Sequence, residues 1–328
     1  MDIDLLSIEP HKVSRDMRGY SVFFYGQPKS GKTTIATKFP KSLLLAFEKG
    51  YNALAGIMVQ PINSWAEFIK VLRQLKDEKV KDKFETIILD TVDIAYQYCE
   101  KYVCSNNGVN TIADIPYGKG YSLVGTEFDA KLREVVQLGY GIVLISHSTD
   151  KTFKDETGEE YNQIVPTLDK RANNIVSRMA DIIGYSRTVS TNTGEKTMLF
   201  MRGTSRYIAG SRFKYTPDYI EFNYDNLVNA IGDAIDKQAQ EDGKELFTDE
   251  RENAYKDTSS HLDFDALMNE FNNLVEKFSK DEEKMSTYYT PRIIEITDKY
   301  LGEGKKISDM KRAQVEQLSL IIDDLKSL

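Results

Sequence analysis

The sequence has few of the residues from which disulfide frameworks and zinc sites are built. Its 328 residues include two cysteines, Cys99 and Cys104, and three histidines. Neither residue type occurs at the spacing of a zinc site, and two cysteines in a chain of this length are typical of reduced thiols in a cytosolic protein. We therefore exclude a disulfide-stapled scaffold and expect both cysteines to be packing residues.

Long apolar runs are also missing. No stretch approaches the ~20 apolar residues that a membrane-spanning helix needs. The first residues, from Met1 to Asp4, lack the basic start and apolar run of a signal peptide. With 41% apolar and 29% charged residues, the composition is that of a globular protein. We expect a soluble protein without membrane association that acts in the cytoplasm, which is the host cytoplasm if a phage encodes it.

Acidic and basic residues balance over most of the chain. Residues 241–328 contain 21 acidic and 13 basic side chains, which leaves 30 of each in residues 1–240. The whole net charge of −8 therefore belongs to the last quarter, and such a break usually marks a separate module.

The composition also changes before that module. Residues 236–262 have few apolar side chains and read as a flexible linker. The apolar spacing beyond them predicts three helices, near 264–279, 286–301 and 311–327. We predict four parts: an N-terminal lead-in (1–19), a core (20–235), the linker (236–262) and an acidic helical C-terminal module (263–328).

Short apolar runs alternate with helical stretches in the core. The runs that predict buried parallel strands are 20–25, 42–47, 86–89 and 141–145. Ser64 and Glu67 form a capping box before one helical stretch. Runs at 182–188, 198–202 and 219–222 predict further strands, with a turn at Gly194 between the first two. We predict an α/β fold with a mixed, mostly parallel sheet flanked by helices.

One segment matches the phosphate-binding loop pattern in full. It follows an apolar strand and precedes a helical stretch, as the pattern requires. Its glycines let backbone N–H groups turn toward phosphates, Lys32 would reach the β- and γ-phosphates, and the Thr33 hydroxyl would hold Mg²⁺. No guanine-reading Asn-Lys-x-Asp motif occurs, so we predict ATP and Mg²⁺ as cofactors. The predicted loop consists of Gly26, Gln27, Pro28, Lys29, Ser30, Gly31, Lys32 and Thr33, followed by Thr34.

Two carboxylates are candidates for the chemistry. Asp90 ends the apolar strand 86–89, where it would orient a water on Mg²⁺. Asp93 is a possible helper, but its interpretation as an acid in the first turn of a helix is favoured. Thr91 stands where many AAA+ ATPases place a glutamate that activates water. We therefore assign that role to Glu48, at the end of the strand 42–47.

The strand 141–145 is followed by Ser146 and His147. Ligands in open α/β sheets lie at the carboxyl ends of strands. We interpret Ser146 and His147 as side chains that bind the γ-phosphate and report its presence to the next loop, although a lone histidine is more often structural.

These elements, in this order, resemble the RecA-like recombinase ATPases. The segments Tyr117-Gly118-Lys119-Gly120 and Ala209-Gly210-Ser211-Arg212-Phe213 make the chain more similar to short RecA-like ATPases of bacteriophages, over residues 18–225. The resemblance implies a catalytic glutamate at Glu48, a sensor before a DNA-contacting loop, and a role in single-strand annealing and recombination. His147 departs from the glutamine usual at the sensor position.

Nine basic residues and two acidic ones lie between Lys170 and Lys214. Phosphate backbones select such clusters, although a solvated charged face is the alternative. Two long segments, 105–125 and 149–167, are interpreted as loops that either contact DNA or are disordered. Candidate arginine fingers or DNA contacts are Arg202, Arg206, Arg212, Lys119 and Arg171.

Three functions remain open at this stage. The first is an ATPase that acts on single-stranded DNA in recombination or annealing. The second is a replicative helicase or helicase-loading motor, and the third is an ATP-dependent switch of protein assembly. RecA-like sites usually form between subunits, so we expect a homo-oligomer by analogy. The acidic module would either compete with DNA for the basic surface or dock a partner such as a single-strand-binding protein.

Overall fold

The computed structural model describes residues 6, 8–192, 194–250 and 263–328. The chain divides into two compact units, the larger spanning Asp4–Lys256 and the smaller mainly Asp257–Leu328. Within the residues that the structure describes, none of the helices combines the length and the apolar character needed to cross a bilayer.

In the described part of the larger unit, ten strands form one sheet in the order β11-β9-β8-β2-β6-β5-β3-β4, with β7 beside β6 and β10 beside β8. The six strands from β8 to β4 are parallel, and the others pair antiparallel. The predicted mixed, mostly parallel sheet is confirmed. The strands are β2 (Ser21–Gly26), β3 (Ser42–Ala46), β4 (Val59–Pro61), β5 (Thr86–Asp90), β6 (Gly141–Lys154), β7 (Glu160–Pro166), β8 (Ile182–Thr191), β9 (Gly194–Phe200), β10 (Gly210–Ser211) and β11 (Tyr219–Glu221).

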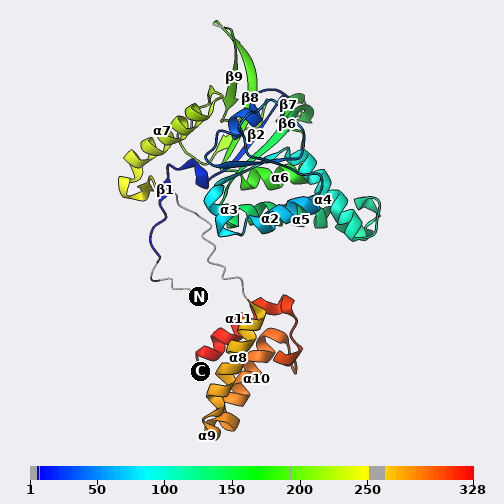
Figure 1. The fold of residues 1–328 in the computed structure, drawn as a ribbon, viewed down its shortest axis with the longest axis vertical. Coiled ribbons are helices and arrows are strands. Elements are labelled where there is room, and N and C mark those ends of the chain that lie inside the picture. Colours follow the sequence, from blue (N-terminus) through cyan, green and yellow to red (C-terminus); the bar gives the residue numbers. More distant parts are fainter. Residues whose placement is uncertain (1–5, 7, 193, 251–262) are drawn as a thin grey trace. The chain divides into compact units, whose positions relative to one another are not determined.

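Helices cover both faces of this sheet (Figure 1). Side chains alternate between the faces along each strand, so Phe23 and Tyr25 of β2 join one core while Val22 and Phe24 join the other. Both cores are buried, which explains why the parallel strands read as continuous apolar runs. The first face packs against α2 (Trp65–Gln74), α4 (Val92–Asn106), α5 (Lys119–Gln137) and α6 (Lys170–Met179), and the second against α1 (Lys32–Ala36) and α7 (Tyr224–Asp242).

The start of α2 shows how local sequence sets an element. The Ser64 hydroxyl accepts the N–H of Glu67 at 3.2 Å, as the capping box predicts. The Glu67 carboxylate accepts the N–H of Asn63, one residue before the expected position, at 2.8 Å. Short α3 (Glu78–Lys83) follows and leads into β5.

Both segments predicted as long loops contain regular structure. The first holds 3₁₀ turns at Ile112–Asp114 and Pro116–Gly118, and its last residues, from Lys119, already belong to α5. The second is a β-hairpin, because β6 continues to Lys154 and pairs with β7. The prediction failed there because the polar hairpin strands carry no apolar alternation.

The predicted linker also begins too early. Helix α7 continues to Asp242, and β12 (Phe247–Thr248) pairs in parallel with β1 (Val13–Ser14) of the predicted lead-in. Arg15 bridges this region through Asp236 at 2.6 Å and Asp249 at 3.1 Å. Residues 236–250 are therefore part of the larger unit. The rest of the predicted linker, from 251 to 262, lies outside the described residues.

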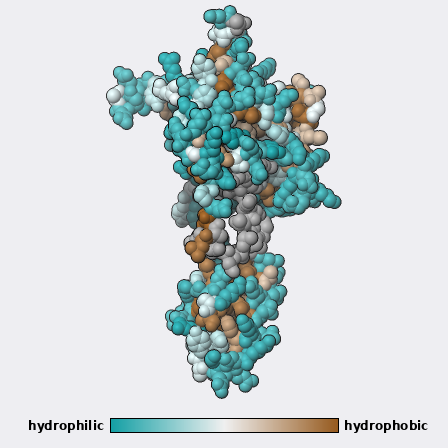
Figure 2. Space-filling model, turned by 90° about the vertical axis from the view of Figure 1, so that its left-hand side faces the viewer, coloured by the Kyte–Doolittle hydropathy of each residue, from teal (hydrophilic) through white to brown (hydrophobic). Residues whose placement is uncertain are grey.

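The smaller unit is a helical bundle with its own core. It contains α8 (Phe264–Ser279), α9 (Glu282–Lys284), a π-helical turn (Met285–Tyr289), α10 (Thr290–Leu301) and α11 (Val315–Lys326). Leu318, Ile321, Ile322 and Leu325 of α11 are almost completely buried against the other helices. Figure 2 shows apolar side chains between the hydrophilic ones on one face of this unit. The predicted helical module is confirmed. The helical stretch predicted near 286–301 begins a few residues earlier, because α9 and the π-helical turn precede α10.

Candidate functional site

The predicted phosphate-binding loop joins β2 to α1. Gly31, just before α1, has a φ of 80°, a left-handed conformation that suits glycine. Gly26 lies so close to β8 that an added Cβ would be 2.2 Å from the Ser186 Oγ. The Ser186 hydroxyl is also 2.8 Å from that of Ser30, so β8 supports the loop from beside it. Ser186 is a site residue that the sequence analysis missed, although its place directly after the apolar first residues of β8 is a usable signal.

Lys32 is folded onto this loop. Its ammonium donates to the backbone oxygens of Gly26 at 3.0 Å and Gln27 at 2.8 Å, and its side chain is almost completely buried. Burial lowers the pKa of Lys32 to about 8, against the opposing charges of Asp90 and Glu48. The ammonium is thus held inside a ring of carbonyls, where an anion is the favourable partner.

Thr33 and Asp90 meet as the sequence predicts. The Thr33 hydroxyl donates to the Asp90 Oδ2 at 2.6 Å. Burial raises the pKa of Asp90, while the Thr33 hydrogen bond acts in the opposite direction. Among the described residues, no three His, Cys, Asp or Glu side chains gather into a metal-binding group. The oxygens of Thr33 and Asp90 nevertheless fit Mg²⁺, which P-loop proteins hold with one hydroxyl, one carboxylate and phosphate oxygens.

Sheet topology brings Glu48 to Asp90. Strands β3 and β5 are neighbours, with Ala46 paired to Asp90. Beyond that pair, the N–H groups of Phe47 and Glu48 both donate to the Asp90 carbonyl, at 2.8 and 3.2 Å. Glu48 therefore lies at the same sheet edge as the phosphate-binding loop, where a carboxylate can accept a proton from water.

His147 faces Glu48. Strand β6 lies between β2 and β5, and the register pairs His147, in the middle of β6, with Gly26 at the end of β2. The His147 Nε2 is 3.5 Å from the Glu48 Oε1. This contact raises the pKa of His147 and lowers that of Glu48, and burial of each side chain opposes the shift. The Nδ1 of His147 is buried and has no hydrogen-bond partner among the described residues.

Ser146 and Asp93 have different places from those predicted. The fully buried Ser146 hydroxyl donates to the Asp93 Oδ1 at 3.0 Å, so it is not turned toward the phosphate loop. The Thr167 hydroxyl donates to the same oxygen, and the Thr167 N–H donates to the His147 carbonyl at 2.9 Å. Burial raises the pKa of Asp93. Asp93 thus ties α4 to both ends of the β6–β7 hairpin, which is more than the helix-end role favoured from sequence.

Two of the predicted finger arginines are held within the chain. The Arg202 guanidinium donates to the backbone oxygens of Thr216 at 3.1 Å and Phe213 at 3.3 Å and also to that of Lys214, so it fixes a turn. We therefore do not propose Arg202 as a finger. Arg212 contacts Asp181 at 3.3 Å, beside the amino ends of β2 and β8 and away from this chain's own phosphate loop.

The other basic candidates are exposed. Arg206 lies in the segment between β9 and β10, where its carbonyl accepts the Ile164 N–H of β7 at 2.8 Å. Lys119 begins α5 and Arg171 lies in the first turn of α6. The stem of Arg171 covers Gly125 of α5 so closely that an added Cβ would be 2.6 Å from the Arg171 Cδ.

The strand order and the convergence of Lys32, Thr33, Glu48 and Asp90 define the core of the P-loop NTPase fold. The comparison with known families agrees. Residues 18–213 match the model of the AAA domain, and the chain belongs to this family.

One relative matches along its whole length. It is the SPbeta prophage-derived uncharacterized protein YorG of Bacillus subtilis strain 168, which is 34% identical over 335 residues, covering 100% of this chain and 99% of the relative. Among solved structures, a KaiC-like protein from Pyrococcus horikoshii OT3 is 13% identical, with a TM-score of 0.34, over 65% of this chain and 100% of that one.

Proposed function

We propose that this protein binds and hydrolyses Mg²⁺-ATP and acts on single-stranded DNA in phage recombination, annealing or replication. The observation that carries the ATPase part is the placement of Glu48. Its backbone hydrogen bond to the Asp90 carbonyl fixes a carboxylate beside the Thr33–Asp90 pair. A binding protein without turnover has no need of a second carboxylate at this position.

Each residue has one task in the proposed reaction. Lys32 and the N–H groups of the loop would bind the phosphates, and Thr33 and Asp90 would hold Mg²⁺, which would neutralise part of the phosphate charge. Glu48 accepts the proton of the attacking water. His147 holds the Glu48 carboxylate in place, and Asp93 fixes the part of β6 from which His147 projects.

The DNA part of the proposal rests on the distribution of charge and on the origin of the relative. The segment from Lys170 to Lys214 has seven more basic than acidic side chains, while the rest of residues 1–240 has the opposite balance. Phosphate backbones favour such a surface. The prophage origin of the full-length relative supports a phage role.

The first experiment measures ATP turnover of the full chain with and without single-stranded DNA, using Lys32→Ala as the blank. We expect turnover in the native chain, stimulation by single strands, and loss of ATP binding or turnover in Lys32→Ala. Native turnover in the variant would refute the assignment of the loop.

Two controls separate the other functions. Unwinding of a tailed duplex would favour a helicase motor over an annealing protein. Turnover that ignores DNA would favour an ATP-dependent switch of protein assembly, and the absence of turnover would overturn the ATPase proposal itself.

We further propose that the protein works as a homo-oligomer in which a neighbouring copy supplies positive charge to the γ-phosphate. Arg202 is held in its own turn and Arg212 lies away from its own loop, so neither completes the site of the chain that carries it. The acidic C-terminal unit would repel nucleic acid and is proposed to dock a protein partner such as a single-strand-binding protein. Sedimentation with and without ATP tests the oligomer.

A further inference from the structure

A groove between α5 and α6 contains positive charge that the nucleotide site does not use. Its cationic lining residues are Arg133, Lys170, Arg171 and Arg178, and its acidic ones are Asp129 and Asp169. Both carboxylates are already occupied. The Asp129 carboxylate pairs with Arg133 at 2.8 Å, and that of Asp169 caps α6 by accepting the N–H of Arg171 at 2.8 Å.

Three cations of this groove therefore have no ion-pair partner among the described residues, against one remaining carboxylate, that of Asp169. Lys170, Arg171 and Arg178 are exposed, and their side chains make no ion pair with any residue that the structure describes. Arg171 and Arg178 are seven residues apart on α6, so they share one face about 10 Å apart along the helix. Two separated, exposed guanidinium groups on one face fit a repeating anion better than a single small one.

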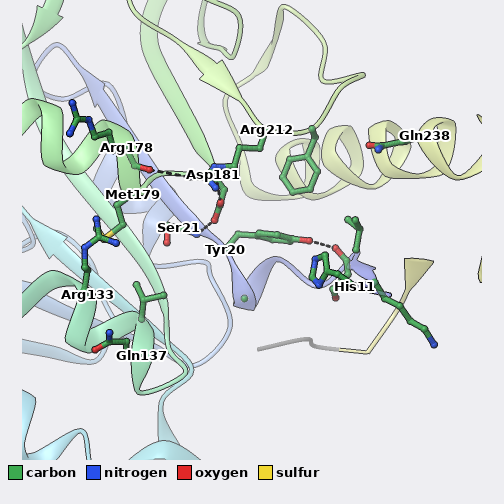
Figure 3. A pocket seen from close by; sticks show the side chains of 16 residues that line it. His11, Tyr20, Ser21, Arg133, Gln137, Arg178, Met179, Asp181, Arg212 and Gln238 are labelled. Atoms are coloured by element: carbon green, nitrogen blue, oxygen red, sulfur yellow. Dashed lines mark hydrogen bonds and ion pairs between the residues drawn. The ribbon is translucent and has the colours of Figure 1, made fainter. Parts of the chain in front are cut away.

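The groove continues into a second cavity. Arg133, Gln137 and Arg178 line both, and the second reaches Arg212 beside the amino ends of β2 and β8. Figure 3 shows Arg133 and Arg178 on one side of this second cavity and His11 and Gln238 on the other. The cavities measure about 970 and 630 Å³. The larger lies near the upper end of the ~300–1,000 Å³ of small-molecule pockets, and the three shared lining residues place the two cavities next to each other.

The other lining groups suit a nucleic acid. Tyr121 lies in the groove with 47% of its surface exposed, at the start of α5, and Asn174 and Gln137 add amide groups. A basic groove with an exposed aromatic ring is the usual combination for a single strand, because phosphates follow the charges and bases stack on the ring.

The hairpin after His147 is less suitable. Residues 149–166 hold five acidic and two basic side chains, and one of the two, Lys154, pairs with Glu160 at 3.4 Å. Phe153 and Tyr161 stack on each other there, with their ring centres 5.9 Å apart. This net negative charge opposes a phosphate backbone.

We propose that the α5–α6 groove is the track of the single-stranded nucleic acid, with Arg171 and Arg178 as its main phosphate contacts and Tyr121 as a stacking platform. This inference rests on the proposed action on single-stranded DNA. It assigns that ligand to the outer helical layer, away from the hairpin that follows the sensor strand.

The test compares the full chain with the double variant Arg171→Gln/Arg178→Gln. Binding of a labelled thirty-residue oligo-dT is measured by fluorescence anisotropy over a series of salt concentrations. The matched control is Arg73→Gln, an exposed arginine of α2 that lines neither cavity. Exposed substitutions of this kind change stability by at most about 0.5 kcal/mol, which thermal unfolding checks.

We expect at least a tenfold loss of affinity in the double variant and a salt slope that is smaller by about 1.4, because two phosphate contacts are lost. In the Arg73→Gln control, both oligo-dT binding and ATP turnover without DNA should stay unchanged. Tyr121→Ala should weaken binding without changing the salt slope, since it removes stacking and no charge.

The outcomes separate the two proposals. If the native chain binds oligo-dT and the double variant binds it equally well, the groove assignment is overturned while action on DNA stands. If the native chain does not bind oligo-dT, both fall. If it binds poly-L-glutamate in preference to oligo-dT, the groove accepts acidic protein segments and the nucleic-acid assignment is overturned.

Discussion

The sheet edge that carries the phosphate-binding loop, here called the nucleotide edge, and the α5–α6 groove both contain positively charged side chains. Those of the edge are buried and hydrogen-bonded, whereas those of the groove are exposed. At the edge, Lys32 is buried and its ammonium donates to three oxygens of its own loop. In the groove, Arg171 and Arg178 are exposed and make no ion pair with any described residue.

The difference follows from what each place must do. Phosphoryl transfer requires groups fixed within a fraction of an ångström, so each side chain is positioned by a neighbour. A nucleic-acid backbone requires charge at intervals, and mobile side chains on a rigid helix supply it. Substitutions at the edge should therefore change rates greatly, whereas substitutions in the groove should change affinity in a salt-dependent way.

The largest effect is expected for Glu48→Gln. The amide cannot accept the proton of water, so turnover should fall by about 10²- to 10⁴-fold while ATP still binds. Single-turnover kinetics with a separate binding assay measures both. Glu156→Gln, the same change in the exposed turn of the β6–β7 hairpin, is the control. Normal hydrolysis by Glu48→Gln would move the base elsewhere.

A smaller effect is expected for Asp93→Ala. It removes the acceptor shared by Ser146 and Thr167, which should lower stability by about 1–3 kcal/mol. As a positioning residue, Asp93 should also affect kcat, by about tenfold, with an unchanged KM for ATP. Asp93→Asn should restore most of the rate, because its side-chain oxygen still accepts a hydrogen bond. A lower unfolding temperature with an unchanged kcat would reduce Asp93 to a structural role.

The smallest effect is expected for the dependence of stability and turnover on pH, through the titration of His147. Contact with Glu48 raises the pKa of His147 above 6.5, Asp93 adds to the rise, and burial and Lys32 oppose it. The charged pair is therefore complete below about pH 6.5, and its contribution to stability is lost as the pH rises through the folded pKa of His147. Loss of that charge also makes Glu48 a stronger base.

Turnover should accordingly rise a few-fold as the pH passes through the folded pKa of His147. In His147→Gln, whose side chain does not titrate, this step should be missing. A pH–rate profile of the two proteins makes the comparison. If both proteins show the same rise in rate with pH, the titrating group is not His147, and His147 has only a structural role.

Much of the nucleotide edge was predictable, because its residues are tied to strand ends. A run of apolar residues predicts a buried parallel strand, and the polar residue that follows the run lies at one edge of the sheet. This reasoning found Glu48, Asp90 and His147 and placed them together. The prediction for Ser146 was wrong. Its hydroxyl points toward Asp93 of the neighbouring helix α4, and the strand pattern does not contain that contact.

The hairpin of β6 and β7 and the end of α7 were missed for a different reason. The hairpin part of β6 has one apolar residue, Phe153, and those of β7, Tyr161, Ile164 and Val165, are irregularly spaced, so the strands lack the alternation by which strands are recognised. The residues after 236 are polar because they form the solvent face of a helix end and a short strand pairing with residues 13–14. Composition alone reads both as disorder.

The sequence by itself determined the fold class, the phosphate-binding loop and the two carboxylates that lie beside it, Glu48 and Asp90. These depend on continuous apolar runs and on short-range backbone geometry, and both are contained in short stretches of the sequence. Only the tertiary structure decided that Arg202 is held in its own turn, that Asp93 joins α4 to the hairpin, and that Arg171 and Arg178 share a groove with α5. Those outcomes depend on contacts between residues distant in the chain, which a local pattern does not contain.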